Sequence, residues 1–250
     1  MRLQNKVALI TGAAQGLGAA MAMRFAEEGA TVFVCDNNAE AGNKTALEIG
    51  NTGGKAFFQP LDVTKEDSWI AAMAFVVANC GRLDVLVNNA GINIRETVEE
   101  MKEENFDTML AVNVKGPFLG IKHAIPLMRK GGGGSIINMS SICGLVGHRY
   151  TTEAYTVTKG ALTLMTKSVG VRYAKDNIRC NSIHPCTVNT PYAQVFMQDP
   201  KKREERLGEV PLGRIATELD VANAALYLAS DEAAFINGVA LPVDGGLTAY

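Results

Sequence analysis

Short apolar runs alternate along the chain with longer segments of helical periodicity, and this alternation limits the possible folds. Near-continuous apolar runs of four to six residues are typical of strands that are buried on both faces of a parallel sheet. Connections between parallel strands are right-handed, so helices placed between such strands cover the two faces of the sheet. The sequence therefore predicts an α/β fold, a single Rossmann-type, doubly wound domain over residues 1–250 with a seven-stranded parallel sheet flanked by helices.

The expected elements follow directly from these runs. The strands are expected at 7–11, 31–35, 55–58, 84–87, 135–139, 178–183 and 239–243. The helices are expected at 16–28, 38–50, 66–79, 103–129 in one or two pieces, 153–174 and 218–229. A long segment at about 190–215 is left between the sixth strand and the last helix. We expect it to form the substrate loop, with the mixed-charge run 201–206 as a solvated helix face.

The composition excludes several classes of partner. The 24 Lys and Arg residues nearly balance the 26 Asp and Glu residues, which gives no electrostatic basis for binding nucleic acid or an acidic membrane. No apolar run approaches the ~18 residues needed to cross a bilayer, and the first residues predict a strand rather than a secretory signal. The five cysteines and three histidines lack the spacing of a zinc site or a disulfide framework. We therefore expect a cytoplasmic protein with reduced thiols and with no metal, nucleic-acid or membrane partner.

A glycine-rich turn joins the first expected strand to the first expected helix. Glycines in such a turn let the backbone approach a pyrophosphate closely, and the helix that follows directs its N–H groups and its positive dipole end at that anion. The spacing is G-x-x-x-G-x-G rather than the commoner G-x-G-x-x-G. The turn predicts a dinucleotide site, and its sequence is Thr11-Gly12-Ala13-Ala14-Gln15-Gly16-Leu17-Gly18.

Asp36 ends the second expected strand, 20 residues after Gly16. A carboxylate at this place can accept hydrogen bonds from the adenosine ribose hydroxyls, and it would repel the 2′-phosphate of NADP. The next residues are Asn37 and Asn38, so no basic side chain stands beside Asp36 to receive that phosphate. The sequence favours NAD over NADP; the alternative is that Asp36 only caps the following helix.

Four motifs in order resemble the short-chain dehydrogenase/reductase family: the turn from Thr11 to Gly18, Asn88-Asn89-Ala90-Gly91, Tyr155-x-x-x-Lys159 and Asp244-Gly245-Gly246. The resemblance extends from residue 5 to the C-terminus and implies a nicotinamide-dependent oxidoreductase that assembles as a homotetramer, partly through the helices that follow residues 103 and 153. It also implies cofactor contacts at Asp62 and Val63 near the adenine, at Asn89, Ala90 and Gly91 near its ribose, and at Pro185, Val188 and Thr190 near the nicotinamide.

Tyr155 and Lys159 are expected to carry the proton chemistry. They stand four residues apart in a helical segment and therefore share one helix face. A tyrosine hydroxyl can exchange a proton with an alcohol oxygen if its pKa falls from ~10 towards the working pH. A nearby ammonium and the positive charge of an oxidised nicotinamide would lower that pKa. The same lysine is suited to holding the nicotinamide ribose.

Two further residues complete the expected catalytic set. Ser141 follows the fifth strand, and a hydroxyl there can hydrogen-bond the substrate oxygen as charge develops on it. In the family the serine three residues before a glycine has this role, which selects Ser141, with Ser140 as the alternative. Asn113 resembles the helix asparagine that holds a water in the family's proton relay.

Cys186 departs from the family pattern, because glycine usually follows the proline at this point. If the position requires a positive φ, a cysteine would be strained there; if it does not, the side chain adds bulk beside the nicotinamide. No base is identifiable beside the thiol, so we do not expect it to act as a nucleophile.

The expected substrate is a neutral secondary alcohol or its ketone. We expect Asn93, Cys143, Val146, His148, Tyr192 and Phe196 to line the pocket, and no basic cluster stands among them to bind a carboxylate or phosphate. The segments around Ser141–Gly147 and 182–185 and the last seven residues are similar to those of alicyclic alcohol dehydrogenases and bacterial hydroxysteroid dehydrogenases. This resemblance favours cyclohexanol- or cyclopentanol-type substrates.

Three alternatives stay open from the sequence. A 3-oxoacyl thioester reductase usually prefers NADP, which Asp36 disfavours. A sugar or polyol dehydrogenase would need more hydrogen-bonding side chains in the 190–215 segment. An NAD-binding sensor or scaffold would have no use for a complete set of Asn113, Ser141, Tyr155 and Lys159.

Overall fold

A computed structural model describes residues 1–190, 193–194 and 197–250 of the chain. Its centre is a seven-stranded parallel sheet with the strand order β3-β2-β1-β4-β5-β6-β7. This order reverses direction beside β1, between β1 and β4, which is the point where α/β sheets bind ligands at the carboxyl ends of their strands. The strands are β1 (Val7–Thr11), β2 (Thr31–Asp36), β3 (Lys55–Pro60), β4 (Val85–Asn88), β5 (Gly134–Met139), β6 (Ile178–Pro185) and β7 (Ala240–Val243).

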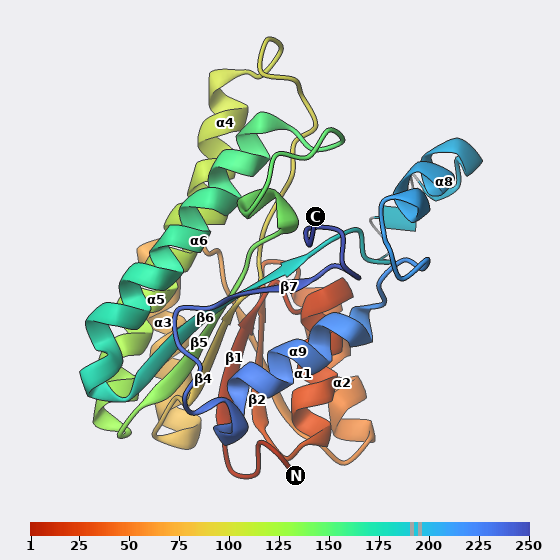
Figure 1. Ribbon diagram of the computed structural model, residues 1–250. Coiled ribbons are helices and arrows are strands. Elements are labelled where there is room, and N and C mark those ends of the chain that lie inside the picture. The colour runs from red at the N-terminus through yellow and green to blue at the C-terminus, as the bar shows by residue number, and fades with distance from the viewer. Residues whose placement is uncertain (191–192, 195–196) are drawn as a thin grey trace.

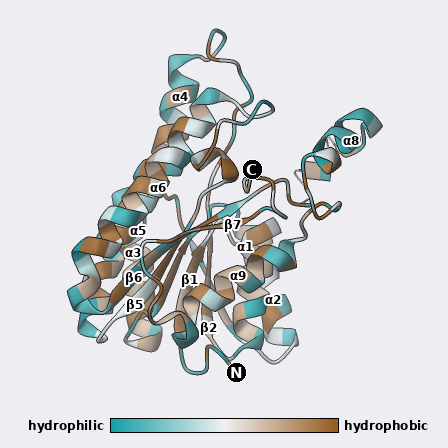
Figure 2. Cartoon of the chain, in the orientation of Figure 1, coloured by the Kyte–Doolittle hydropathy of each residue, from teal (hydrophilic) through white to brown (hydrophobic). Residues whose placement is uncertain are grey.

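Helices cover both faces of the sheet (Figure 1), as an all-parallel sheet requires. The helices are α1 (Gly16–Glu27), α2 (Ala39–Asn51), α3 (Glu66–Cys80), α4 (Glu103–Leu110), α5 (Gly116–Lys130), α6 (Glu153–Tyr173), α8 (Pro200–Gly208) and α9 (Glu218–Ala229). One apolar core lies between the sheet and α1 and α9, and a second lies between the sheet and α3 and α5. Figure 2 shows the apolar strands at the centre and a largely hydrophilic α8 away from them.

The expected fold class is therefore confirmed, with small changes in the element bounds. The expected helix 103–129 is two α-helices joined by a π-helical segment at Ala111–Lys115, a local widening that is often found at functional sites. The mixed-charge run 201–206 lies in α8, which has no buried residue. Among the described residues, no helix is long and apolar enough to cross a membrane.

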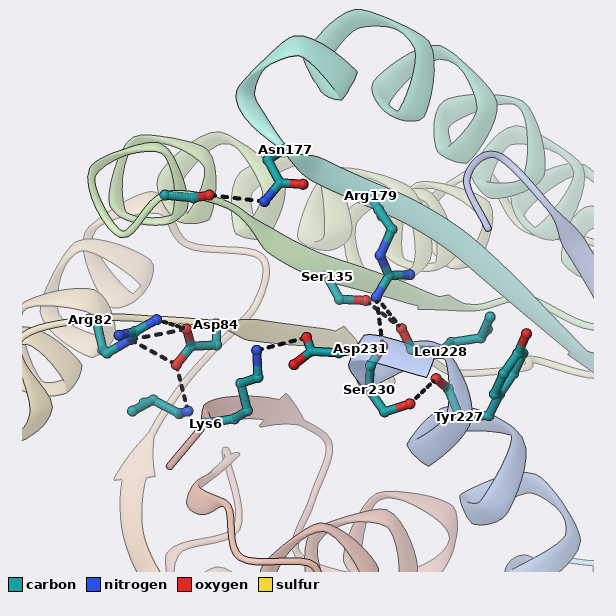
Figure 3. A network of polar contacts seen from close by, with 12 residues as sticks. Lys6, Arg82, Asp84, Ser135, Asn177, Arg179, Tyr227, Leu228, Ser230 and Asp231 are labelled. Carbon is teal, nitrogen blue, oxygen red and sulfur yellow. Dashed lines mark hydrogen bonds and ion pairs between the residues drawn. The ribbon is translucent and has the colours of Figure 1, made fainter. Parts of the chain in front are cut away.

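Polar side chains tie the amino ends of the strands to the end of α9 (Figure 3). Asp84 accepts a hydrogen bond from the backbone N–H of Val7 at 2.8 Å and pairs with the guanidinium of Arg82. The guanidinium of Arg179 donates to the carbonyl oxygens of Leu228 and Ser230 at 2.8 and 3.2 Å. A cation at a helix C-terminus satisfies carbonyls that have no partner within the helix. These contacts fix the end of the sheet that is opposite the candidate site.

Candidate active site

The glycine-rich turn after β1 brings two backbone segments into close contact. Gly12 and Gly16 adopt positive φ angles of 62° and 58°, which favour glycine because it has no Cβ. Gly18 lies in the first turn of α1, where an added Cβ would stand 2.1 Å from the carbonyl oxygen of Gly12. The turn and the helix can therefore approach this closely only with glycine at residue 18.

The N-terminus of α1 is suited to an anion. Gln15 occupies the cap position in extended conformation and makes no side-chain hydrogen bond to the helix, and the first turn contains no acidic residue. By contrast, Asn38 caps α2 and Thr217 caps α9 with their side chains. The first backbone N–H groups of α1 thus remain available to an anion, and the helix dipole favours negative charge there.

The loop after β4 holds this turn in place. The side-chain amide of Asn89 donates to the carbonyl oxygens of Thr11 and Gly12 at 2.9 and 3.0 Å. The hydroxyl of Thr11 accepts from the backbone N–H groups of Asn89 and Ala90, each at 3.0 Å. Asn89 therefore supports the turn itself. This role of Thr11 could not be predicted from the motif, because its partners lie in the loop after β4, far away in the sequence.

Asp36 lies at the carboxyl end of β2, beside the turn. One carboxylate oxygen accepts from the N–H of Ala14 at 3.0 Å, and the other accepts from the N–H of Asn38 at 3.0 Å. Each oxygen has two lone pairs, so both retain acceptor capacity for a ligand. Asp36 thus steadies the turn and could also bind a ligand, whereas the residue that caps α2 is Asn38.

Asp62 and Val63 lie just after β3, along the same edge of the sheet. The carboxylate of Asp62 accepts from the hydroxyl and the N–H of Thr64 at 2.7 and 2.9 Å, and these bonds hold its pKa below the usual range. Val63 is buried, and its carbonyl oxygen accepts from the indole of Trp69 at 3.0 Å. Both residues are rigidly held.

Tyr155 and Lys159 share one face of α6, as their spacing predicts. The Lys159 ammonium lies 5.4 Å from the centre of the Tyr155 ring. It donates to the carbonyl oxygen of Met139, at the end of β5, at 2.7 Å. Only 4% of Lys159 is exposed, and this burial lowers the pKa of its ammonium to about 8. An amine this deeply buried is a feature of active sites.

Ser140 and Ser141 differ clearly in their surroundings. The Ser140 hydroxyl donates to the carbonyl oxygen of Lys159 at 3.0 Å and lies 3.2 Å from the hydroxyl of Thr163. Its contacts are thus with α6. The Ser141 hydroxyl accepts from the N–H of Cys143 at 3.3 Å, which leaves its own proton to donate into the cavity described below. This difference favours Ser141 as the residue that binds the substrate oxygen.

Asn113 lies at the centre of the π-helical segment and is 1% exposed. Its side-chain oxygen accepts from the N–H of Ile92 at 2.8 Å, and its amide donates to the carbonyl oxygen of Ile92 and the hydroxyl of Thr158. These bonds join the loop after β4 to α6. An added Cβ at Gly91 would lie 3.3 Å from Asn113 Oδ1 and 3.4 Å from Lys159 Nζ, so these groups gather behind Gly91.

A cavity of about 240 Å³ opens between these groups, slightly smaller than the ~300–1,000 Å³ of typical ligand sites. The expected residues on its wall come from the turn, from the loops after β4, β5 and β6, and from α6. They are Leu17, Asn93, Ser141 together with the alternative Ser140, Cys143, His148, Tyr155, Pro185, Val188 and Thr190. Val146 is exposed and does not contribute to the described wall. Tyr192 and Phe196 lie outside the described residues.

The cavity wall also contains two arginines that the sequence analysis did not single out. Arg95 and Arg206 are the charged residues of the wall that is described. The Arg206 guanidinium lies 4.0 Å from the centre of the Tyr150 ring and donates to Glu209 at 3.4 Å. His148 Nε2 lies 3.3 Å from Glu209 as well, without hydrogen-bond alignment. Arg206 is on α8, so no local pattern marks it as a neighbour of residues 148–150.

Cys186 is not strained. Among the described residues, only Asn5 and Asn177 combine a side chain with a positive φ. The Cys186 side chain contributes to the cavity wall, and burial raises the pKa of its thiol to about 11. A thiol that stays protonated is a poor nucleophile, so bulk in the cavity is the consequence of the cysteine.

Comparisons with known proteins agree with this architecture. A family model described as enoyl-(acyl carrier protein) reductase matches residues 12–248. A solved short-chain type dehydrogenase/reductase from Mycobacterium ulcerans superposes with a TM-score of 0.95 at 30% identity, covering 99% of this chain and 91% of that one. The chain belongs to the short-chain dehydrogenase/reductase family, and it is an oxidoreductase that acts on CH–OH groups with a nicotinamide cofactor.

Two curated relatives indicate the range of alcohols in this part of the family. The chain is 44% identical to cyclopentanol dehydrogenase of Comamonas sp. (strain NCIMB 9872) over 248 residues, covering 99% of both chains. It is 43% identical to trans-4-hydroxycyclohexanecarboxylate dehydrogenase of Sinomonas cyclohexanicum over 254 residues, covering 99% of this chain and 95% of the relative. The first name describes a neutral cyclic alcohol and the second a cyclic alcohol with a carboxylate.

The burial of Lys159 predicts a pH dependence of stability. Its folded-state pKa of about 8 lies below the 10.5 of an exposed lysine, so the unfolded chain binds more protons between these two values. The folded state therefore gains stability as the pH rises from 8 to 10.5. Relative to a Lys159→Met variant, the gain should be at most about 3 kcal/mol, at about 1.36 kcal/mol per pKa unit. Urea unfolding without cofactor, at one protein concentration, measures it.

Both proteins in that comparison should carry Tyr155→Phe, so that the difference between them depends on Lys159 without its neighbouring phenol. Lys167→Met is the matched control, because Lys167 is exposed on the same helix. Its loss should leave the slope of stability against pH as it is. If the free energy of unfolding changed equally with pH in the Lys159→Met variant and in its parent, the lowered pKa of Lys159 would be contradicted.

Proposed function

We propose that this protein oxidises a secondary alicyclic alcohol with NAD, and reduces the corresponding ketone with NADH. The proposal rests on one observation: Ser141 and Tyr155 line the same small cavity. The buried Lys159 ammonium lies 5.4 Å from the centre of the Tyr155 ring. A hydrogen-bond donor, a proton acceptor and a cation beside it are the groups that alcohol oxidation requires.

The side chains divide the reaction between them. The nicotinamide, when bound, accepts a hydride from the carbinol carbon. Tyr155 takes the hydroxyl proton of the alcohol as a phenolate, and the Lys159 ammonium stabilises that negative charge. Ser141 donates a hydrogen bond to the same substrate oxygen. Asn113 keeps α6 and the loop after β4 at a fixed separation through Thr158 and Ile92.

The residues along the sheet edge fit a nicotinamide dinucleotide. The uncapped N-terminus of α1 suits the pyrophosphate, and Asp36 retains acceptor capacity for the adenosine ribose. The Lys159 ammonium has three donors, of which one reaches Met139, so the others can serve the nicotinamide ribose. The two residues directly after Asp36 are Asn37 and Asn38, so no basic side chain stands next to it to balance a 2′-phosphate. This supports NAD over NADP.

Two classes of substrate are proposed, a neutral alicyclic alcohol and an anionic alicyclic hydroxy acid. A neutral cyclopentanol- or cyclohexanol-type alcohol fits the small volume of the cavity and the resemblance noted in the sequence. An alicyclic hydroxy acid is the second candidate, because the charged residues on the described wall, Arg95 and Arg206, are both basic. A carboxylate is the natural partner of a guanidinium. The neutral expectation rested on pocket residues that did not include these arginines.

Assembly into a homotetramer is also part of the proposal. Exposed apolar side chains lie on α5 and α6, the helices from which the resemblance builds the tetramer; they include Phe118, Val157, Leu164 and Val171. Burying such a surface against a second copy would stabilise the assembly. The five free cysteines suit the reducing cytoplasm expected from the sequence.

Tyr155→Phe tests the proposed chemistry. We expect turnover of cyclohexanol with NAD to fall by about 10³-fold, because general acid–base catalysis contributes 10²- to 10⁴-fold. NAD binding measured by calorimetry should persist. Tyr173→Phe, which removes a hydroxyl from the other end of α6, is the control and should turn over normally. Unchanged turnover in Tyr155→Phe, followed through nicotinamide absorbance, would reject the mechanism.

Asp36→Asn tests the choice of cofactor. Like charges near a protein surface repel by about 1–4 kcal/mol, so the wild-type protein should prefer NAD over NADP by about tenfold or more in kcat/KM. Removing the charge should raise kcat/KM with NADP and lower it with NAD. Asp62→Asn should instead lower both values together, because Asp62 is assigned to the adenine, which the two cofactors share. A wild-type preference for NADP would refute the role of Asp36.

Arg206→Met tests whether the substrate is a neutral alicyclic alcohol or an alicyclic hydroxy acid. If the substrate is an alicyclic hydroxy acid, kcat/KM for 4-hydroxycyclohexanecarboxylate should fall by about 10- to 100-fold, the worth of a hydrogen bond to a charged group, while cyclohexanol is little affected. Arg203→Met, exposed on the same helix, is the control. A wild-type protein that uses cyclohexanol better than the hydroxy acid, with no selective loss in Arg206→Met, would favour the neutral alcohol.

A further inference from the structure

A buried histidine connects β6 to the backbone of the candidate catalytic serine. Ser182 and His184 are two residues apart on β6, so their side chains leave the same face of the strand. His184 is 0% exposed. Its Nε2 lies 2.8 Å from the Ser182 hydroxyl, and its Nδ1 lies 2.7 Å from the carbonyl oxygen of Ser141. The imidazole therefore bridges the strand and the loop after β5.

The partners of the imidazole determine where its proton lies. A carbonyl oxygen can only accept, so Nδ1 carries the hydrogen and donates it to Ser141. The Ser182 hydroxyl could instead donate its proton to the carbonyl oxygen of Val239, which is 3.3 Å away. Nε2 would then have to donate to the Ser182 oxygen, so both ring nitrogens would carry a hydrogen and the ring would be charged. Burial opposes that charge and lowers the pKa of His184. Ser182 therefore donates to Nε2, and the ring is neutral.

The backbone of Ser140 and Ser141 is held from several directions. The Ser141 carbonyl oxygen also accepts from the N–H of Gly144 at 2.9 Å, and the N–H of Ser140 donates to the carbonyl oxygen of Ile183 at 2.9 Å. The end of β6 thus fixes two consecutive residues of the loop after β5. The Gly144 and Ile183 bonds are made by backbone groups, whereas the bond from His184 depends on the identity of a side chain.

We propose that His184 is a positioning residue for the reaction, which directs the Ser141 hydroxyl into the cavity by holding the Ser141 carbonyl group. This inference rests on the proposed function, because it assigns Ser141 the task of binding the substrate oxygen. Displacement of a catalytic group by about 1 Å can cost about 10²-fold in rate, so a bond that fixes its peptide has a measurable effect. His184 is not on the described wall of the cavity, so its effect on the reaction is transmitted through Ser141.

His184→Leu removes the donor, and His184→Asn retains an N–H near the place of Nδ1. We expect kcat for cyclohexanol oxidation to fall by about 10- to 100-fold in His184→Leu, with the Kd for NAD changed by less than about twofold. His184→Asn should recover most of that loss. Ile183→Val, a truncation at the neighbouring buried residue, is the control for a general disturbance of β6 and should keep kcat close to the wild-type value.

A double-mutant cycle tests whether His184 acts through Ser141. In a Ser141→Ala background the hydroxyl to be positioned is absent, so adding His184→Leu should lower kcat by less than about twofold. An equal loss in both backgrounds would overturn the proposal, because it would indicate a general structural role. A kcat for His184→Leu within about twofold of wild type would also overturn it. If His184→Leu does not fold, the cycle is run with Ser182→Ala, which removes the hydrogen bond that orients the ring.

Failure of this inference is distinguishable from failure of the proposed function. If Tyr155→Phe turns over alcohols normally, the proposed chemistry is wrong whatever His184 does. If turnover depends on Tyr155 and Ser141 while the His184 variants match the wild type, only the positioning role is wrong.

Discussion

The contact between the glycine turn and α1 is the constraint on which the rest of the site depends. Because Gly18 carries no side chain, the first turn of α1 can lie against the carbonyl of Gly12. Asn89 binds that same carbonyl from the loop after β4. The loops after β1 and β4 therefore share one rigid framework at the carboxyl edge of the sheet.

The buried lysine shows how stability and chemistry oppose each other in this fold. Desolvation of the Lys159 ammonium costs folding free energy, and the hydrogen bond to the Met139 carbonyl offsets part of it. In the proposed mechanism this cost has a use, because a cation stabilises a neighbouring phenolate most where water does not screen it. The neighbouring Ser140 hydroxyl, which binds the Lys159 carbonyl, further restrains this turn of α6.

Features encoded by local pattern could be predicted from the sequence, and features created by tertiary packing could not. The strands and the glycine turn rest on neighbouring residues, so periodicity and spacing indicated them. The roles of Tyr155 and Lys159 followed from the resemblance to the family motif, because their spacing alone shows only that they share a helix face. Arg206 reaches the Tyr150 backbone across 56 residues, and His184 reaches Ser141 across 43. No spacing rule links such pairs. Ser140 and Ser141 are adjacent, and only the direction in which the chain leaves β5 separates their roles.

The exposed position of α8 has a consequence for the evolution of substrate specificity in such enzymes. This helix buries none of its residues, yet Arg206 on it forms part of the cavity wall. Substitutions at the exposed positions of α8 cost little folding free energy, although Arg206 itself is largely covered and pairs with Glu209. Substitutions at Gly12 or Gly18 would disturb the turn. New specificities can therefore arise by drift in one peripheral helix while the redox machinery is inherited intact.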